Sequence, residues 1–374
     1  MNATYRADHV EQLVERWRPR AALLERSFES GVSIYGAGFV GTWARRYLQS
    51  IGAVVRSFVD RDPRKIGSTI DGVPVIGPSS PQMSSVPALF IAARHAVREV
   101  TRDLEPLGCA VMPFDGYFVC RNYARLAALR DGWLADARSV ETFNAILVAM
   151  LTGSVAPCRA VMEKDMYFGL PEFSGNFDEA FVDAGAFVGD TVERFLWENL
   201  GTFRHIYAFE PGHRQFQALQ RRMGRLAEEW AFNPSSVSLE RAGLAAAEGR
   251  MACTFVDDSP LRHGLAAAPA REAPGDERLS APVLSLDQYL EGRPVTFIKA
   301  DVEGMEMELL RGAQATIRRC KPKMALCIYH YPSDLYEVAE YVRGLVPEYK
   351  LSLRQHAPIL GDYVLYCWTE DVSP

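Results

Sequence analysis

Short apolar runs alternate with amphipathic stretches along the first third of this chain. Residues 42–50 have helical spacing and lie between two of these runs, an order typical of a β-strand, α-helix, β-strand unit with a parallel sheet. Residues 5–29 also have apolar positions at helical spacing, and Pro19 predicts an interruption there. The runs that predict strands are 32–35, 54–59, 73–75 and 88–92.

A second alternation of the same kind begins at residue 180 and continues to the end of the chain. Helical stretches fit between most of its apolar runs but not between the last two, which therefore predict an antiparallel hairpin at a sheet edge. The runs that predict strands are 180–184, 206–209, 237–241, 296–300, 324–329, 349–354 and 363–368. The predicted fold class is α/β, with two Rossmann-like domains in tandem.

These patterns divide the chain into four expected segments. A length of 374 residues agrees with two domains, because single cores usually stop growing at about 250–300 residues. Residues 265–281, rich in Ala, Pro and charge, predict a flexible loop that could serve as a lid. The segments are an N-terminal helical segment at 1–30, a Rossmann-like domain at 31–116, a helical bridge at 117–176 and a second α/β domain at 177–374.

The composition indicates a globular protein and argues against several functions. A hydrophobic fraction of 48% and a charged fraction of 24% are ordinary for a globular protein, and a net charge of −6 argues against nucleic-acid binding. The 7 Cys are scattered and never spaced as C-x-x-C, which argues against a disulfide framework or a zinc site. We find no signal peptide and no apolar run long enough to span a membrane, so we expect a cytoplasmic protein.

The most informative segment is FVDAGAFVGDT at residues 181–191. An apolar strand ends near Asp183, Gly185 permits a tight turn with close approach of a ligand, and a helix with free N–H groups begins at 189–191. Some 20 residues later a second strand ends in Glu210, where nucleoside-binding α/β folds place the carboxylate that takes ribose hydroxyls. The alternative is a plain strand–turn–helix with incidental glycines. The predicted binding residues here are Asp183, Gly185, Gly189, Asp190, Thr191 and Glu210.

The chain from about residue 160 to 370 resembles the FkbM family of methyltransferases. The resemblance implies a class I fold, S-adenosylmethionine as methyl donor and transfer to a hydroxyl oxygen of a glycan sugar or a polyketide-type natural product. The residue pattern alone gives only nucleoside-like binding. The matching pieces are VDAGAFVGDT (182–191), YAFEPGHRQFQAL (207–219), SLDQYL (285–290), FIKADVEGMEMELLRGA (297–313) and CIYHYPSDLYEV (327–338).

Transfer to an alcohol needs a base within hydrogen-bond reach, and the carboxyl ends of the strands are where such a group belongs. Lys299 lies near the end of the strand at 296–300, and Asp301 and Glu303 follow it. Asp301 is also a candidate for the cofactor. Lys299 and Asp301 could instead form a structural ion pair, and Glu303 could help to cap the next helix. His330, with an ordinary pKa near 6.5, is the candidate base, although a histidine there could also be structural.

Two further features concern cofactor and metal binding. Ala242 and Gly243 follow the third strand and are expected to line an adenine, with Asp257 or Ser259 replacing the acidic contact that is missing there. Asp301, Glu303 and His330 could bind a divalent ion. We favour direct base catalysis and predict no metal, because the ligands lack tight spacing.

A first glycine-rich turn, Gly36-x-Gly38-x-x-Gly41, follows a strand and opens a helix, with Asp60 ending the next strand. This context is that of a dinucleotide site, and with GVPVIGP at 72–78 it also resembles the sugar-nucleotide-binding domain of PglD-like acetyltransferases. The unit could also serve only for packing or dimerisation. No Tyr-x-x-x-Lys pair follows, so we favour nucleotide-sugar binding or a structural role over redox activity.

Three hypotheses for the whole chain therefore remain: a sugar or natural-product O-methyltransferase, an NAD(P)-linked oxidoreductase, and a non-catalytic nucleotide-binding protein. The first is favoured. Its partners would be a small-molecule or glycan acceptor, and a homodimer remains open.

Overall fold

The structure is a computed structural model that describes the chain except for residues 1–4, 105–107, 256–262, 270–279 and 371–374. The chain forms two compact units. The first comprises residues 1–162 with 331–333 and 357–361, and the second comprises the remaining residues. None of the helices among the described residues combines the length and the apolar character needed to cross a membrane.

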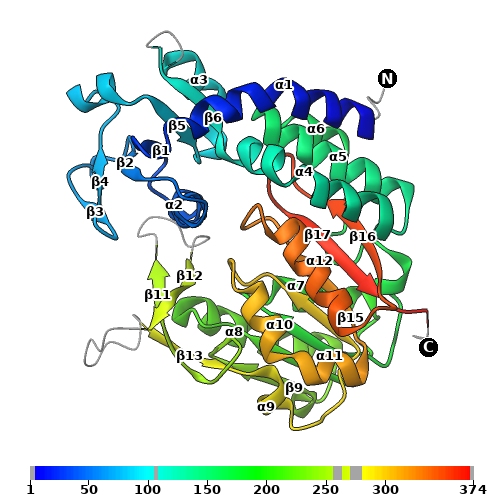
Figure 1. Cartoon of the computed structure of the whole chain (residues 1–374). Helices are drawn as coiled ribbons and strands as arrows, with labels where there is room; N and C mark the ends of the chain where they lie inside the picture. The colour runs from blue at the N-terminus through cyan, green and yellow to red at the C-terminus, as the bar shows by residue number, and fades with distance from the viewer. Residues whose placement is uncertain (1–4, 105–107, 256–262, 270–279, 371–374) are drawn as a thin grey trace. The chain divides into compact units, whose positions relative to one another are not determined.

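The first unit contains a six-stranded sheet in the order β3-β4-β2-β1-β5-β6, parallel except for β3 against β4. Helices α1, α4 and α5 pack on one another, and α1 and α4 also contact β6 (Figure 1). Its strands are β1 (Val32–Tyr35), β2 (Val55–Val59), β3 (Thr69–Ile70), β4 (Val73–Ile76), β5 (Ala88–Ile91) and β6 (Ala110–Pro113). Its helices are α1 (Ala7–Glu25), α2 (Phe39–Ser50), α3 (Val97–Leu104), α4 (Phe114–Trp133), α5 (Ala137–Thr152) and α6 (Ala156–Ala160).

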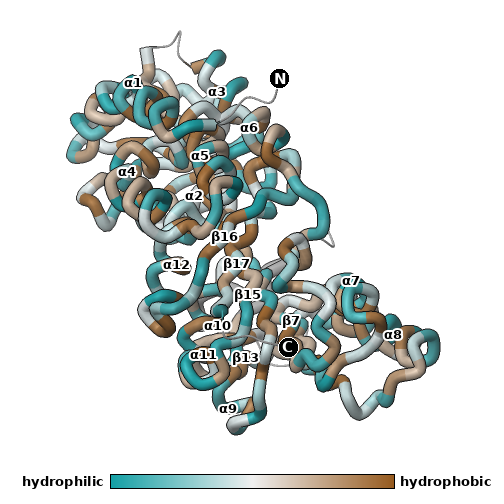
Figure 2. Tube along the Cα trace, turned by 90° about the vertical axis from the view of Figure 1, so that its right-hand side faces the viewer, coloured by the Kyte–Doolittle hydropathy of each residue, from teal (hydrophilic) through white to brown (hydrophobic). Residues whose placement is uncertain are grey.

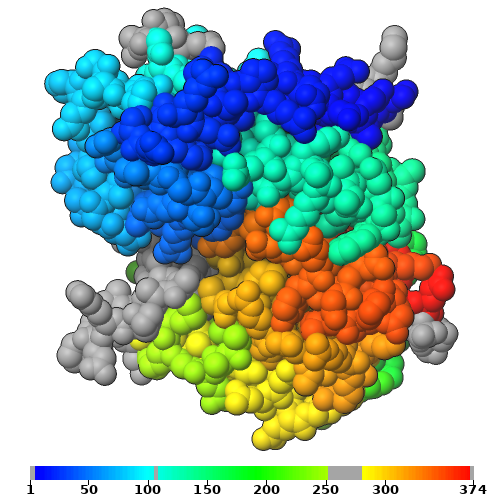
Figure 3. Space-filling model, in the orientation of Figure 1, coloured from blue at the N-terminus to red at the C-terminus, as the bar shows by residue number. Residues whose placement is uncertain are grey.

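The expected interruption at Pro19 is wrong, because α1 continues through it. Buried apolar residues lie on both sides of Pro19, with Val10 and Val14 before it and Ala21 and Leu24 after it. Packing of this face against α4 and α5 offsets the cost of proline in a helix, which is about 3 kcal/mol. The other face of α1 is open to solvent, as Figure 3 shows for the blue segment.

The second unit contains a seven-stranded sheet in the order β16-β17-β15-β14-β7-β8-β9. Strands β16 and β17 form an antiparallel pair at its edge, which confirms the predicted hairpin and the α/β class. Figure 2 shows hydrophilic residues on α11. The strands are β7 (Ala180–Ala184), β8 (His205–Phe209), β9 (Val237–Glu240), β14 (Phe297–Ala300), β15 (Lys323–Cys327), β16 (Lys350–Gln355) and β17 (Tyr363–Trp368). The helices are α7 (Asp190–Glu198), α8 (His213–Trp230), α9 (Leu286–Leu290), α10 (Glu306–Gly312), α11 (Gln314–Cys320) and α12 (Asp334–Leu345).

A small sheet in the order β10-β13-β11-β12 was not foreseen. The loop expected at 265–281 is wrong at both ends, since β12 covers 263–269 and β13 begins at 280, while 270–279 lie outside the described residues. Alanine-rich sequence there pairs with β11 and does not form a loop. The strands are β10 (Gly243–Leu244), β11 (Gly249–Phe255), β12 (His263–Pro269) and β13 (Ser280–Leu284).

A buried ion pair joins the amino-terminal ends of two strands in the second sheet. Lys323 at the start of β15 pairs with Glu179 just before β7, and its Nζ donates to the Glu172 carbonyl at 2.7 Å. Both charged side chains are at most 2% exposed. Burial lowers the pKa of Lys323, although Glu179 opposes this shift. The pair therefore stabilises the fold only while both partners are present.

Replacing Lys323 with Met should lower the free energy of unfolding by about 3–5 kcal/mol, because Glu179 would be left buried without its cation. Urea unfolding followed by circular dichroism measures this change. Lys321→Met is the matched control, since the Lys321–Glu348 pair is exposed and should cost less than about 1 kcal/mol. Equal effects of the two substitutions would contradict the buried-pair account.

Candidate functional site

The glycine-rich loop between β7 and α7 is held against the ends of neighbouring strands. Gly185 has φ +77°, and a Cβ there would lie 1.9 Å from the Asp301 carbonyl oxygen, so no larger residue fits. The amides of Gly185 and Ala186 donate to the Phe209 carbonyl at 3.0 and 2.9 Å. Gly189, with φ +82°, precedes α7. The glycine at 185 is thus required by packing of the loop against protein backbone, a reason that sequence analysis did not anticipate.

Glu210 ties this loop to the one that follows β8. Its side chain is buried, with Oε2 accepting the Phe187 amide at 2.9 Å and Oε1 accepting the Gly212 amide at 2.6 Å. Each carboxylate oxygen has two lone pairs, so Glu210 can accept further hydrogen bonds from ligand hydroxyls. The structure places Glu210 beside the loop that sequence analysis paired with it.

Asp183 and Lys299 form a buried ion pair beneath the loop. Their charged atoms are 2.9 Å apart, and Lys299 Nζ also donates to the Gly185 carbonyl at 2.7 Å. Burial raises the pKa of Asp183, and Lys299 partly opposes this shift. Burial lowers the pKa of Lys299, but the nearby charges of Asp183 and Asp301 together outweigh burial, and the net shift is upward. Sequence analysis offered Asp301 as the ion-pair partner of Lys299, but the partner in the structure is Asp183.

Asp301 follows β14 and is held by two phenols. Oδ2 accepts the Tyr167 hydroxyl at 2.9 Å, and Oδ1 accepts the Tyr329 hydroxyl at 3.0 Å. Burial raises the pKa of Asp301, but the positive charges of Lys299 and His330 and the two phenols bring the net shift downward. Asp301 is thus kept as a carboxylate. Tyr167 precedes β7 with φ +71° and belongs to no recognisable motif, so sequence analysis missed it.

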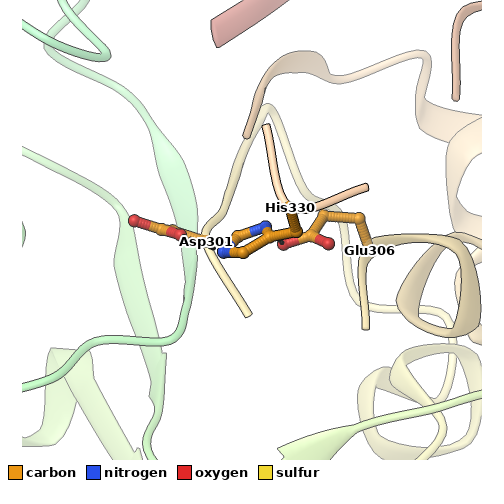
Figure 4. Close-up of side chains that lie close together, drawn as sticks. All are labelled: Asp301, Glu306 and His330. Carbon is orange, nitrogen blue, oxygen red and sulfur yellow. Dashed lines mark ion pairs between the residues drawn. The ribbon is translucent and has the colours of Figure 1, made fainter. Parts of the chain in front are cut away.

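His330 lies between acidic side chains at both of its ring nitrogens. Nδ1 is 3.2 Å from Glu306 Oε1, and Nε2 is 3.7 Å from Asp301 Oδ1 and 3.6 Å from Glu303 Oε2. Figure 4 shows the imidazole between Asp301 and Glu306. Burial lowers the pKa of His330, but Glu306, Glu303 and Asp301 outweigh burial and raise it well above 6.5. The pKa of His330 is therefore not the ordinary value assumed from the sequence, and the imidazole keeps its proton to higher pH than an ordinary histidine does.

The same cluster contains a set of atoms that could hold a metal ion. One ligand atom each from Asp301, Glu306 and His330 lie within 4.8 Å of one another. Imidazole nitrogen and carboxylate oxygen are ligands that first-row divalent metals accept. Glu306, the first residue of α10, takes the place that sequence analysis gave to Glu303 in this set.

The remaining residues predicted from the sequence belong to several different segments. Glu303 has φ +55° and a side chain 46% exposed, and α10 begins three residues later without a side-chain cap from Met305. Asp190 and Thr191 form the first turn of α7. Ala242 is buried, and Gly243 begins β10. Asp257 and Ser259 lie outside the described residues.

The first unit has a glycine turn in which each glycine has a separate steric environment. Gly36 has φ +104°, no atom lies within 4 Å of a Cβ placed on Gly38, and a Cβ on Gly41 would lie 1.8 Å from the Gly36 carbonyl oxygen. The three glycines thus allow a tight turn, leave one open position and permit close packing of the helix against the strand.

Asp60 occupies the position in this unit that corresponds to Glu210. Its Oδ2 accepts the Ala37 amide at 2.8 Å, and Lys65 Nζ lies 3.4 Å away. Burial raises the pKa of Asp60, but hydrogen bonds from the Asp62 and Ala37 amides and the charge of Lys65 outweigh it and lower the pKa. In both units a carboxylate after the second strand thus accepts an amide of the glycine loop.

Comparison with known proteins finds a family match within the second unit. Residues 183–349 match the family model described as Methyltransferase FkbM domain, which confirms the predicted resemblance over these residues. The crystal structure of Methyltransferase FkbM from Methylobacillus flagellatus KT is similar over 96% of this chain and 98% of that chain, with 22% identity and a TM-score of 0.59. At this identity the likeness concerns the fold.

A second solved structure has a lower TM-score. The crystal structure of an rRNA methylase from Streptococcus thermophilus is similar over 53% of this chain and 90% of that chain, with 17% identity and a TM-score of 0.33. A TM-score this low supports no argument about function. The sequence matches none of the curated proteins with which it was compared. The resemblance of the first unit to PglD-like domains stays a prediction.

Proposed function

We propose that this protein transfers the methyl group of S-adenosylmethionine to a hydroxyl oxygen of a sugar or a polyketide-type natural product. The observation that carries the proposal is the connection of Glu210 to the glycine loop after β7, within a segment that matches a methyltransferase family. This geometry places a carboxylate and the start of a helix at the carboxyl edge of a parallel sheet, where α/β folds bind their ligands.

Glu210 is the residue proposed to hold the ribose hydroxyls. Ala242 and Gly243 would border the adenine, and the loop from Gly185 to Thr191 would border the rest of the nucleoside. Asp183 and Lys299 support this loop from below, since Lys299 donates to the Gly185 carbonyl. Asp301, kept ionised at the end of β14, offers a negative charge that favours the positive sulfonium of the donor.

The donor supplies an electrophilic methyl carbon. The acceptor oxygen forms the new C–O bond as the S–C bond breaks, and the sulfur keeps the bonding electron pair. His330, once deprotonated, takes the proton of the acceptor hydroxyl. Holding the donor and the acceptor in line is the main contribution expected of the site.

Binding and turnover test the proposal together. Isothermal titration with S-adenosylhomocysteine should give saturable binding, which Asp183→Ala weakens because Lys299 then no longer holds the loop. Incubation of the protein with S-adenosylmethionine and a panel of glycans and polyketides should give O-methylated product by mass spectrometry. Absence of nucleoside binding would contradict the proposal, and binding without any methylated product would favour the non-catalytic alternative.

We further propose that the first unit binds the phosphates of a nucleotide or nucleotide-sugar beside Gly38. The open space at Gly38 and the nearby Lys65 ammonium favour an anionic ligand. Asp60 is already bonded to Ala37 and Lys65, which gives it a role in holding the loop. The NAD(P)-linked oxidoreductase remains the alternative for this unit.

Replacing Gly38 with Val should weaken binding of UDP or NAD at least about tenfold, because the side chain would occupy the space that the phosphates need. The fold should tolerate this change, since no neighbour lies within 4 Å. Gly132→Ala, at another open glycine of this unit, is the control. Titration calorimetry with each ligand measures the effect. Unchanged affinity, or no affinity in the unaltered protein, would exclude the site.

A further inference from the structure

Charged and titratable groups face His330 from several elements. Asp301 and Glu303 follow β14, Glu306 begins α10, and the Tyr329 ring lies 4.2 Å from the imidazole, between centroids. Burial raises the pKa of Asp362, just before β17, and the nearby charge of His330 partly opposes this shift. These groups leave Nε2 facing Asp301 and Glu303, and Nδ1 facing Glu306.

Glu306 differs from the other carboxylates in being buried and fixed. Its side chain is 2% exposed, compared with 23% for Asp301 and 46% for Glu303. Glu306 Oε1 accepts the Val302 amide at 3.0 Å and lies 3.2 Å from His330 Nδ1. A buried carboxylate that is anchored to backbone can hold an imidazole ring in one orientation and one tautomer.

We infer that Glu306 is a positioning residue, which accepts the Nδ1 proton of His330 and so leaves Nε2 as the atom that takes the acceptor's proton. This inference rests on the proposed function and adds a residue to it. Nε2 is the nitrogen on the side of Asp301 and Glu303, at the carboxyl edge of the sheet. Glu306 stays behind the imidazole and touches neither donor nor acceptor.

The arrangement also bears on metal binding. The lone pairs of the two imidazole nitrogens point in divergent directions, so one cation can bind only one of them. A cation on Nε2 would have Asp301 as its neighbour and would leave Glu306 on the far side of the ring. The ligand atoms of Asp301, Glu306 and His330 are close together, but they need not all bind one ion. The contact with Nδ1 indicates that Glu306 is a partner of the imidazole.

His330 Nε2 first loses a proton to solvent and then gains the proton of the acceptor. The resting imidazolium first loses the Nε2 proton to solvent and keeps the Nδ1 proton in its bond to Glu306. During transfer the acceptor O–H proton moves to Nε2 as the C–O bond forms and the S–C bond breaks. Glu306 stabilises the imidazolium that results.

The test is Glu306→Gln, with Glu308→Gln on the same helix as the matched control, because Glu308 is an exposed partner of Arg311. We expect Glu306→Gln to lower kcat about 10²–10⁴-fold while the Kd for S-adenosylhomocysteine stays within about twofold. The rise of kcat/KM with pH should move to lower pH, because the charge that most raises the His330 pKa is removed. A merely structural role would not move this profile.

A measurement without substrate separates this inference from the proposed function. Nitrogen-15 NMR of the histidine rings should show Nδ1 of His330 protonated at high pH in the unaltered protein, and Glu306→Gln should abolish this tautomer preference. An Nε2–H tautomer in the unaltered protein would overturn the inference, as would an unshifted pH profile in Glu306→Gln. Loss of methyl transfer in EDTA with recovery in Mn²⁺ would make the site metal-dependent and would also overturn it. Failure of methyl transfer with the expected tautomer would count against the proposed function alone.

Discussion

Replacing His330 with Asn should lower the kcat for methyl transfer about 10²–10⁴-fold, the range that a general base contributes. The Asn side chain cannot take the acceptor's proton. The Kd for S-adenosylhomocysteine should change little, because Glu210 and the loop after β7 are untouched. Single-turnover transfer from labelled S-adenosylmethionine, with calorimetry for the Kd, measures the two effects separately.

His205→Asn is the matched control, since His205 begins β8 at the opposite end of the strand from Glu210 and bonds Ser238. It should leave kcat within about twofold, as expected for a change remote from the reacting groups. The pH profile adds a second check. The raised pKa of His330 means that the base form appears only at higher pH than for an ordinary histidine, so the rise of kcat/KM should lie above the usual pH range of a histidine. Full activity in His330→Asn would remove the histidine from the mechanism.

Replacing Glu210 with Ala should raise the Kd for S-adenosylmethionine at least about 100-fold. The change removes the proposed contacts to the ribose hydroxyls, and hydrogen bonds to a charged group contribute about 1.5–3 kcal/mol each. It also leaves the Phe187 and Gly212 amides without their acceptor, which loosens the loop. Equilibrium dialysis with labelled donor measures the Kd.

Two further variants test whether the lost contacts of Glu210 cause the weaker donor binding. Glu210→Gln keeps one acceptor oxygen and should weaken binding less than Glu210→Ala. Glu228→Gln, at an exposed position of α8, should leave the Kd unchanged. If Glu210→Ala binds the donor as tightly as the unaltered protein, Glu210 serves only to hold the loop and the ribose assignment is wrong.

Apolar periodicity predicted most of the second sheet, because strands buried on both faces have continuous apolar sequences that end at turns. The same periodicity predicted that the carboxyl ends of β7, β8 and β14 share one edge of the sheet. Asp301 and His330 are close together at this edge. Pro19 and β12 were predicted wrongly because tertiary packing and strand pairing override local propensity.

The roles of individual side chains were harder to predict. Glu306 is one of several carboxylates in DVEGMEMELL, and only the orientation of α10 shows which one meets Nδ1. Tyr167 contacts Asp301 from 134 positions away in the sequence. The pKa of His330 depends on three carboxylates whose distances follow from the fold. Spacing along a chain carries none of this information.

A crystal structure of the protein with S-adenosylhomocysteine tests the central claim most directly. The account predicts the nucleoside at the carboxyl ends of β7 and β8, with both ribose hydroxyls within hydrogen-bond distance of the Glu210 carboxylate. A nucleoside bound elsewhere, or a ribose that makes no contact with Glu210, would contradict it.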